Sequence, residues 1–132
     1  MSVDSPNLDD LDRFESAVER VEKPWGYELV YTSGSPYSGK VIFVRAGEAL
    51  SLQFHRVKDE TMYVQEGRVE LEIGEPGRTP DTEVVAAGRA FRITPGTVHR
   101  LRALEDTTIL EASTPETDDI VRLEDRYGRG ES

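Results

Sequence analysis

LSLQFHRVKDETMYVQEG, residues 50 to 67, is the stretch that decides the fold of this chain. SLQFH and TMYVQEG have the length and composition of β-strands, and the polar turn RVKD separates them. Residues two positions apart in a strand point to the same face, so Gln53 and His55 project together. The turn can return the chain and aim the Glu60 carboxylate at the same point. The stretch therefore predicts two strands whose ligand-type side chains converge.

Further strand-like runs lie on both sides of this stretch, with turn residues at intervals of roughly ten. This spacing predicts an all-β, mostly antiparallel sandwich or barrel. The chain has 132 residues, of which 36% are apolar, so one domain with a modest core is expected. The additional strands are predicted within residues 23–31, 40–47, 68–74, 83–88, 90–96, 98–105 and 107–113.

Both ends of the chain differ in composition from this central part. Residues 1–21 are rich in Asp, Glu and Ser and are predicted to form an acidic extension ahead of a single domain at 22–129. The tail DDIVRLEDRYGRGES is predicted to form a short helix or a strap. The extension has the apolar spacing of a short helix, with residues three or four apart at Leu8, Leu11, Phe14, Val18 and Val21.

Composition excludes several classes of function. The formal net charge is −10, which argues against a nucleic-acid partner, because such proteins neutralise phosphates with a basic surface. The chain contains no cysteine, so disulfides and thiolate metal sites are excluded. It also has neither a leader-like start nor an apolar run long enough to span a bilayer. A cytoplasmic protein without membrane contact is expected.

The second histidine, His99, follows the turn TPG. Together with Gln53, His55 and Glu60 it would supply two imidazoles, one carboxylate and one amide oxygen. Such mixed nitrogen and oxygen ligands suit Zn, Mn, Fe, Co or Ni better than copper(I). Two interpretations remain open at this point: one divalent ion bound by all four residues, or two ordinary histidines on the surface or in the core.

The spacing of these residues resembles the two sequence motifs of the cupin superfamily. Residues 47–67 read G-x7-H-x4-E-x6-G, and residues 88–99 read G-x7-G-x2-H. The resemblance implies a small antiparallel jelly-roll barrel with a metal ion inside it. The chain departs from the motifs at Gln53, where cupins often have His, and at Thr94 and Ala103, where Pro and Asn are common.

A narrower resemblance covers about residues 22–129. KPWGYELV, LSLQFH, PGTVHRL and DDIVRLEDRYGR are similar to the C-terminal cupin domain of type II mannose-6-phosphate isomerases, and to small stand-alone cupins of that group. This implies metal-dependent interconversion of an aldose phosphate and a ketose phosphate, and a homodimer. Those domains are usually fused to a nucleotidyltransferase, which is not found here, so sugar-nucleotide synthesis by this chain alone is not expected.

The chain also departs from that isomerase pattern. Arg56, Val57 and Thr61 stand where the isomerase domains usually have histidines, and the segment from Glu111 to Asp118 is shorter than in the fused enzymes. Altered substrate contacts and a reshaped cavity mouth are therefore expected.

Aldose–ketose isomerisation through an enediolate needs a base near the carbon and positive charge near the oxyanion. Glu111 is a candidate base, because an inward carboxylate would have its pKa raised by burial. Lys40 aligns with a lysine of the family and alternates with Ile42 and Val44, so it could face inward and hold the oxyanion or a phosphate. The alternative for Lys40 is a solvated lysine at a strand end.

Phosphate binding would require guanidinium groups. Arg122 and Arg126, with Arg129, could fold over the barrel mouth from the tail, or they could form salt bridges with neighbouring acids instead. Arg45 and Arg92 are further candidates. Trp25 and Tyr27 are expected to pack in the core or at a dimer seam rather than to stack on a sugar.

Three functional hypotheses follow, and all require a divalent ion. The leading one is a sugar-phosphate isomerase acting on a phosphorylated sugar. The second is an Fe(II)-dependent dioxygenase, because two histidines and a carboxylate are the ligand set of non-haem oxygenases. The third is a non-catalytic module that binds a sugar or carboxylate.

Overall fold

The computed structural model describes residues 14–116 and 119–129, and their regular structure is entirely β-sheet. No helix in these residues is long and apolar enough to cross a membrane. The described strands are β1 (Glu19–Lys23), β2 (Gly26–Thr32), β3 (Ser38–Val44), β4 (Leu52–His55), β5 (Glu60–Glu66), β6 (Arg68–Gly74), β7 (Asp81–Ala86), β8 (Ala90–Ile93), β9 (Val98–Ala103), β10 (Thr107–Ser113) and β11 (Ile120–Glu124).

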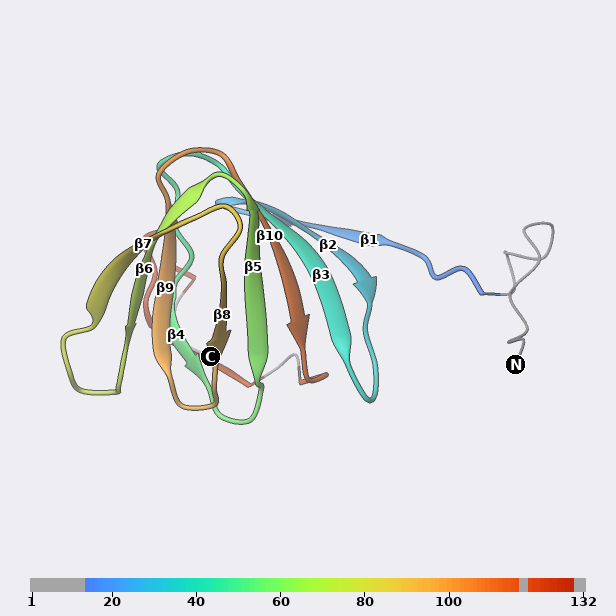
Figure 1. The fold of residues 1–132 in the computed structure, drawn as a ribbon. Helices are drawn as coiled ribbons and strands as arrows, with labels where there is room; N and C mark the ends of the chain where they lie inside the picture. Colours follow the sequence, from blue (N-terminus) through green and yellow to red (C-terminus); the bar gives the residue numbers. More distant parts are fainter. Residues whose placement is uncertain (1–13, 117–118, 130–132) are drawn as a thin grey trace.

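The strands form two antiparallel sheets that face each other (Figure 1). One sheet has the order β1-β2-β3-β10-β5-β8 and the other has the order β11-β4-β9-β6-β7. Neighbours that are distant in sequence, such as β3 and β10, show that the chain crosses repeatedly between the sheets. This is the jelly-roll arrangement of a cupin, so the predicted all-β antiparallel fold is confirmed.

The inner face of the first sheet changes character along its strands. Toward one end, Val44, Val64 and Ile109 are almost completely inaccessible to solvent and belong to the apolar core. Toward the other end, the same strands turn Lys40 and Glu111 inward, and these two residues are direct register partners. Alternate side chains of each strand point to the same inner face. The polar end of the barrel therefore continues directly from its apolar end along the same strands.

The turn between β5 and β6 depends on Gly67. Its φ is +98°, a left-handed conformation that side chains rarely adopt, and a Cβ atom there would lie 2.5 Å from the Asp106 carbonyl oxygen. Glycine therefore lets this hairpin pack closely against the chain that enters β10.

Residues 14–18 of the acidic extension, where the apolar spacing also allowed a short helix, form no helix. Phe14 and Val18 are exposed, and the chain is already in strand β1 at Glu19, before the predicted domain boundary at residue 22. Pairing of β1 with β2 accounts for this difference, because a sheet edge supplies hydrogen bonds that a thin apolar stripe cannot outweigh. The remaining part of the extension, residues 1–13, lies outside the described residues.

The tail forms a strap. β11 pairs with β4 at the edge of the second sheet. Beyond it, the Tyr127 hydroxyl accepts a hydrogen bond from the Ala49 amide and donates one to Glu48. These contacts hold the end of the described chain against the barrel.

Candidate metal centre and cavity

The side chains of His55, Glu60 and His99 meet inside the barrel. Each offers a ligand atom, and these atoms all lie within 4.8 Å of one another. His55 Nε2 is 3.2 Å from Glu60 Oε2, and His99 Nε2 is 3.8 Å from Glu60 Oε1. The predicted convergence of two imidazoles and one carboxylate is therefore present in the structure.

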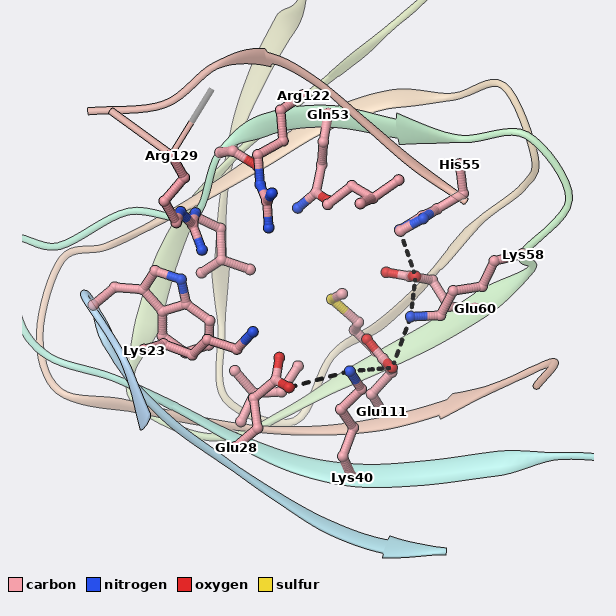
Figure 2. A pocket seen from close by; sticks show the side chains of 16 residues that line it. Lys23, Glu28, Lys40, Gln53, His55, Lys58, Glu60, Glu111, Arg122 and Arg129 are labelled. Atoms are coloured by element: carbon pink, nitrogen blue, oxygen red, sulfur yellow. Dashed lines mark hydrogen bonds and ion pairs between the residues drawn. The ribbon is translucent and has the colours of Figure 1, made fainter. Parts of the chain in front are cut away.

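Three strands bring these residues together. His55 ends β4, Glu60 begins β5 in the opposite sheet, and His99 lies on β9 beside β4. Gln53, two residues before His55, is paired in register with His99. Figure 2 shows the Gln53 side chain pointing into the cavity between Arg122 and His55. Gln53 therefore lies beside the triad of His55, Glu60 and His99, on the part of the cavity wall that β4 and β9 form.

The second nitrogen of each imidazole has a neighbour that orients the ring. His99 Nδ1 is 2.9 Å from the Thr97 carbonyl, so Nδ1–H donates and the lone pair of Nε2 is left facing Glu60. Burial lowers the pKa of His99, more strongly than the Glu60 charge raises it, which favours the neutral ring that a metal requires. His55 Nδ1 lies 3.3 Å from Asp119 Oδ1.

Asp119 also fixes the turn between the two ligand strands. Its Oδ2 accepts hydrogen bonds from the Val57 and Lys58 amides, at 2.6 and 2.8 Å. A carboxylate behind a histidine ligand orients the ring and increases its basicity. The strap residue Asp119 is therefore a supporting residue for the centre, one that the sequence analysis did not identify.

The residues present fit a divalent cation. His99 Nε2 is buried and makes no hydrogen bond within the described part of the chain, although buried polar atoms normally do. Burial opposes the charge of Glu60, but the hydrogen bond from His55 and the positive charge of Lys58 outweigh it and lower its pKa to about 2. An ionised carboxylate and a free imidazole lone pair, both desolvated, make an appropriate ligand set for a hard or borderline ion.

The centre opens onto a cavity of about 140 Å³ between the two sheets (Figure 2). Its walls combine apolar residues from the core with charged residues of both signs. The lining consists of Lys23, Trp25, Glu28, Lys40, Ile42, Leu50, Ser51, Gln53, His55, Lys58, Glu60, Met62, Glu111, Ile120, Arg122 and Arg129.

Alternating charges run along one wall of this cavity. Lys58 Nζ lies 3.2 Å from Glu60 Oε2 and 3.3 Å from Glu111 Oε2. Lys40 Nζ lies 3.9 Å from the same Glu111 oxygen and 3.3 Å from Glu28 Oε1. The predicted inward orientation of Lys40 and Glu111 is thus observed, and a continuous chain of charges connects them to the candidate ligand Glu60.

Burial and neighbouring charges set the pKa values of Glu111 and Lys58 in this row of charged side chains. Burial and the nearby Glu60 charge raise the pKa of Glu111, against the opposing effect of Lys58. Burial lowers the pKa of Lys58, but Glu111 and Glu60 more than compensate, so the pKa lies above its usual value. Lys58 was missed in the sequence because periodicity does not define side-chain direction in the short turn RVKD.

The predicted arginines divide into two groups. Arg122, from β11, and Arg129, held by Asp125 at 2.7 Å, line the cavity on the side away from Lys58 (Figure 2). Burial, and then the positive charge of Arg129, lower the pKa of Arg122. Adjacent like charges of this kind favour an anion between them.

The other arginines do not line the cavity. Arg126 donates to the Gly47 carbonyl at 2.8 Å, and Arg45 donates to the Pro24 carbonyl at 2.7 Å. Arg92 is exposed and pairs with Asp59, because it lies on the outward face of β8. Their predicted contact with a substrate therefore stays a prediction that the cavity lining does not support.

Comparison with known proteins assigns the chain to a family. The family described as "Mannose-6-phosphate isomerase C-terminal" matches residues 10–125. The chain is also 32% identical over 123 residues to a mannose-1-phosphate guanylyltransferase of Escherichia coli K12. The match covers 89% of this chain and 25% of that protein, so the chain spans about a quarter of the relative's length.

Solved structures share the fold. The capsular polysaccharide assembling protein CapF of Staphylococcus aureus superposes with a TM-score of 0.73 and 14% identity, over 86% of this chain and 34% of that one. Oxalate decarboxylase of Bacillus subtilis superposes with a TM-score of 0.71 and 16% identity, over 80% and 30%. At these identities the likeness concerns the fold of the barrel alone.

Proposed function

The chain belongs to the mannose-6-phosphate isomerase C-terminal family of cupins, and from this premise we propose that it is a metal-dependent isomerase of phosphorylated sugars. The observation that carries the proposal is the shared cavity wall. His55 and Glu60 of the triad line the same small cavity as Lys58 and Glu111, so a cation site and a proton-transfer site adjoin.

The roles follow from these positions. His55, Glu60 and His99, with Gln53 as a fourth ligand, would hold the ion, which when bound supplies Lewis-acid polarisation of the substrate oxygen. Glu111 Oε2 takes the proton from one carbon and returns it to the neighbouring carbon, for which a pKa raised by burial is suitable.

Two cationic groups assist this transfer. Lys58 and Lys40 place ammonium groups within 3.3 and 3.9 Å of Glu111 Oε2, where they can also stabilise the negative charge of an enediolate. Arg122 and Arg129 would bind the phosphate at the other side of the cavity. Because the cavity is smaller than the usual ~300–1,000 Å³ of ligand sites, it admits the reacting end of the sugar, with the phosphate nearer the mouth.

Three of the departures from the isomerase pattern lie outside this cavity. Arg56, Val57 and Thr61 are exposed and do not line it. The absence of the family's histidines at these three positions therefore does not change the residues that line the cavity. This supports the isomerase proposal.

Metal content and isotope exchange test the proposal. Purified protein is expected to bind about one divalent ion per chain, and His55→Ala with His99→Ala should abolish binding. Nuclear magnetic resonance of mannose 6-phosphate and fructose 6-phosphate in deuterated water should then show exchange at C1 or C2. Glu111→Gln should lose the exchange and keep the metal, whereas Arg92→Ala, altered outside the cavity, should retain both. Metal-loaded protein without exchange on any sugar phosphate contradicts the isomerase proposal.

A second candidate function has one specific observation in its favour. Two histidines and one carboxylate, as in His55, His99 and Glu60, match the ligand set of non-haem Fe(II) oxygenases. Oxygen consumption that requires Fe(II), without sugar exchange, would select this function. Sugar binding with neither reaction would select a non-catalytic module.

A further inference from the structure

One buried hydroxyl in the cavity wall has no role in the chemistry proposed above. Ser51 lines the cavity, and only 1% of its surface is exposed. Its Oγ makes no hydrogen bond to any residue of 14–116 or 119–129, although the large majority of buried side-chain polar atoms have a partner. A buried hydroxyl without a partner is destabilising, and alanine would fill nearly the same space without that cost. The hydroxyl therefore points to a partner that is not part of the protein.

The position of Ser51 along the chain separates it from the metal centre. Ser51, Gln53 and His55 alternate in sequence, and all three line the cavity. At ~3.3 Å per extended residue, the Ser51 Cα lies roughly 7 Å from that of Gln53 and roughly 13 Å from that of His55. His99 pairs in register with Gln53, so an ion held by the triad would lie beside Gln53 and His55. The short Ser51 side chain therefore cannot bind that ion, and it meets another part of a ligand.

Burial separates Ser51 from the candidate phosphate site as well. The Arg129 side chain is 22% exposed and Arg122 is half-buried, so a phosphate held by these groups would remain in contact with solvent. Ser51 meets only a group that has entered the cavity completely, where Trp25 and Ile42 supply apolar lining. A neutral hydroxyl can both donate and accept, and its natural partner in such a place is another neutral hydroxyl.

We propose that Ser51 is a specificity-determining residue, and that its Oγ forms a hydrogen bond with one sugar hydroxyl on a carbon other than the two that react. This inference rests on the proposed function, because it takes the ligand to be a phosphorylated, polyhydroxylated chain. A site that hydrogen-bonds a substrate hydroxyl strongly rejects an analogue that lacks it, because the buried group of the site is then left unpaired. Ser51 therefore selects fully hydroxylated sugar phosphates over one particular deoxy sugar phosphate.

Ser51→Ala should change ligand affinity without lowering stability. The hydroxyl makes no hydrogen bond within the described chain, so its removal should leave the urea midpoint of metal-loaded protein unchanged or raise it. Ligand affinity should fall at least ~10-fold, because the ligand hydroxyl loses its buried partner. Ser38→Ala is the matched control, because Ser38 is 6% exposed, donates to the Thr32 carbonyl at 3.1 Å and does not line the cavity. It should lower the midpoint and leave the affinity unchanged.

Calorimetric titration of the metal-loaded protein with mannitol 6-phosphate measures this affinity. This polyol is the reduced form of mannose 6-phosphate, so it keeps the hydroxyls of the sugar chain and cannot isomerise. Wild type should bind one of its 3-, 4- and 5-deoxy analogues at least ~10-fold more weakly than the parent polyol. Ser51→Ala should bind that analogue and the parent within about twofold of each other, because the contact that distinguishes them is already absent.

Failure of this inference is distinguishable from failure of the proposed function. Equal affinity of wild type and Ser51→Ala for the polyol, or discrimination among the deoxy analogues that is absent in wild type or persists in Ser51→Ala, would overturn the role of Ser51 and leave the isomerase proposal intact. A midpoint lowered as far as in Ser38→Ala would show a structural role for Ser51 and would also overturn it. Metal-loaded wild type that binds neither the polyol nor mannose 6-phosphate would contradict the proposed function, and this inference with it.

Discussion

Lys58→Met tests the electrostatic structure of the cavity most directly. The substitution removes the ammonium and retains an unbranched side chain of similar length. Lys58 is buried and contacts Glu60 Oε2 at 3.2 Å and Glu111 Oε2 at 3.3 Å. Without it, two buried carboxylates remain on the same wall of the cavity, with only Lys40 beside Glu111 and His55 beside Glu60. The metal-free variant should therefore be less stable than wild type.

The magnitude follows from these distances. At an effective dielectric constant of about 20, two unit charges 3.2 Å apart attract by about 5 kcal/mol, and Lys58 makes two such contacts. Desolvation of the ammonium offsets several kcal/mol of this attraction. Removing one partner of a buried ion pair typically costs about 3–5 kcal/mol, and we expect a loss in this range for the free energy of unfolding.

Urea unfolding in EDTA at pH 7.5 measures this loss. The double variant Lys58→Met/Glu111→Gln is the control, and it should recover a large part of the stability because one of the opposed charges is gone. Lowering the pH should reduce the difference in the free energy of unfolding between Lys58→Met and wild type, because protonation neutralises the carboxylates that lost their cation. A divalent ion should also narrow it by compensating Glu60. A loss of less than about 1 kcal/mol in EDTA would refute the assignment of Lys58 as the central cation.

Three further predictions concern other parts of the structure. Asp119→Asn should weaken divalent-ion affinity roughly 10- to 100-fold, measured by competition with a chelator, because it removes the charge behind His55. The pKa of Asp125 is lowered to about 2, chiefly by its hydrogen bond with Arg129, so its contribution to stability is present above about pH 4 and is lost as the pH falls through about 2. Asp125→Asn should thus cost about 1 kcal/mol in urea unfolding at pH 7, after allowing for solvent screening, and this cost should shrink as the pH falls through about 2. Gly67→Ala should lower the free energy of unfolding by about 2 kcal/mol or more, measured in the same way, because of its left-handed backbone and the close approach of Asp106; an unchanged midpoint would contradict this.

The strands and the candidate ligands could be predicted because both are local properties. Alternation in runs such as RVELEIG identifies a half-buried strand without knowledge of its neighbours. The same alternation put Gln53 and His55 on one face, and the motif spacing brought Glu60 and His99 into the same group. Strand β1 was not foreseen, because the apolar spacing of residues 8–21 is that of a thin helical stripe and does not reveal the hairpin pairing of β1 with β2.

The sequence by itself determined the all-β antiparallel class, with the jelly-roll barrel implied by the family resemblance. It also determined the nitrogen and oxygen character of the candidate metal ligands and the exclusion of thiolate chemistry. Only the tertiary structure decided which charged side chains share the cavity: Lys58 turns inward, whereas Arg45, Arg92 and Arg126 turn to other partners. The physical reason is that a strand defines the direction of its side chains by periodicity, while long side chains on turns and tails point wherever closure of the sheets places an opposite charge or a carbonyl.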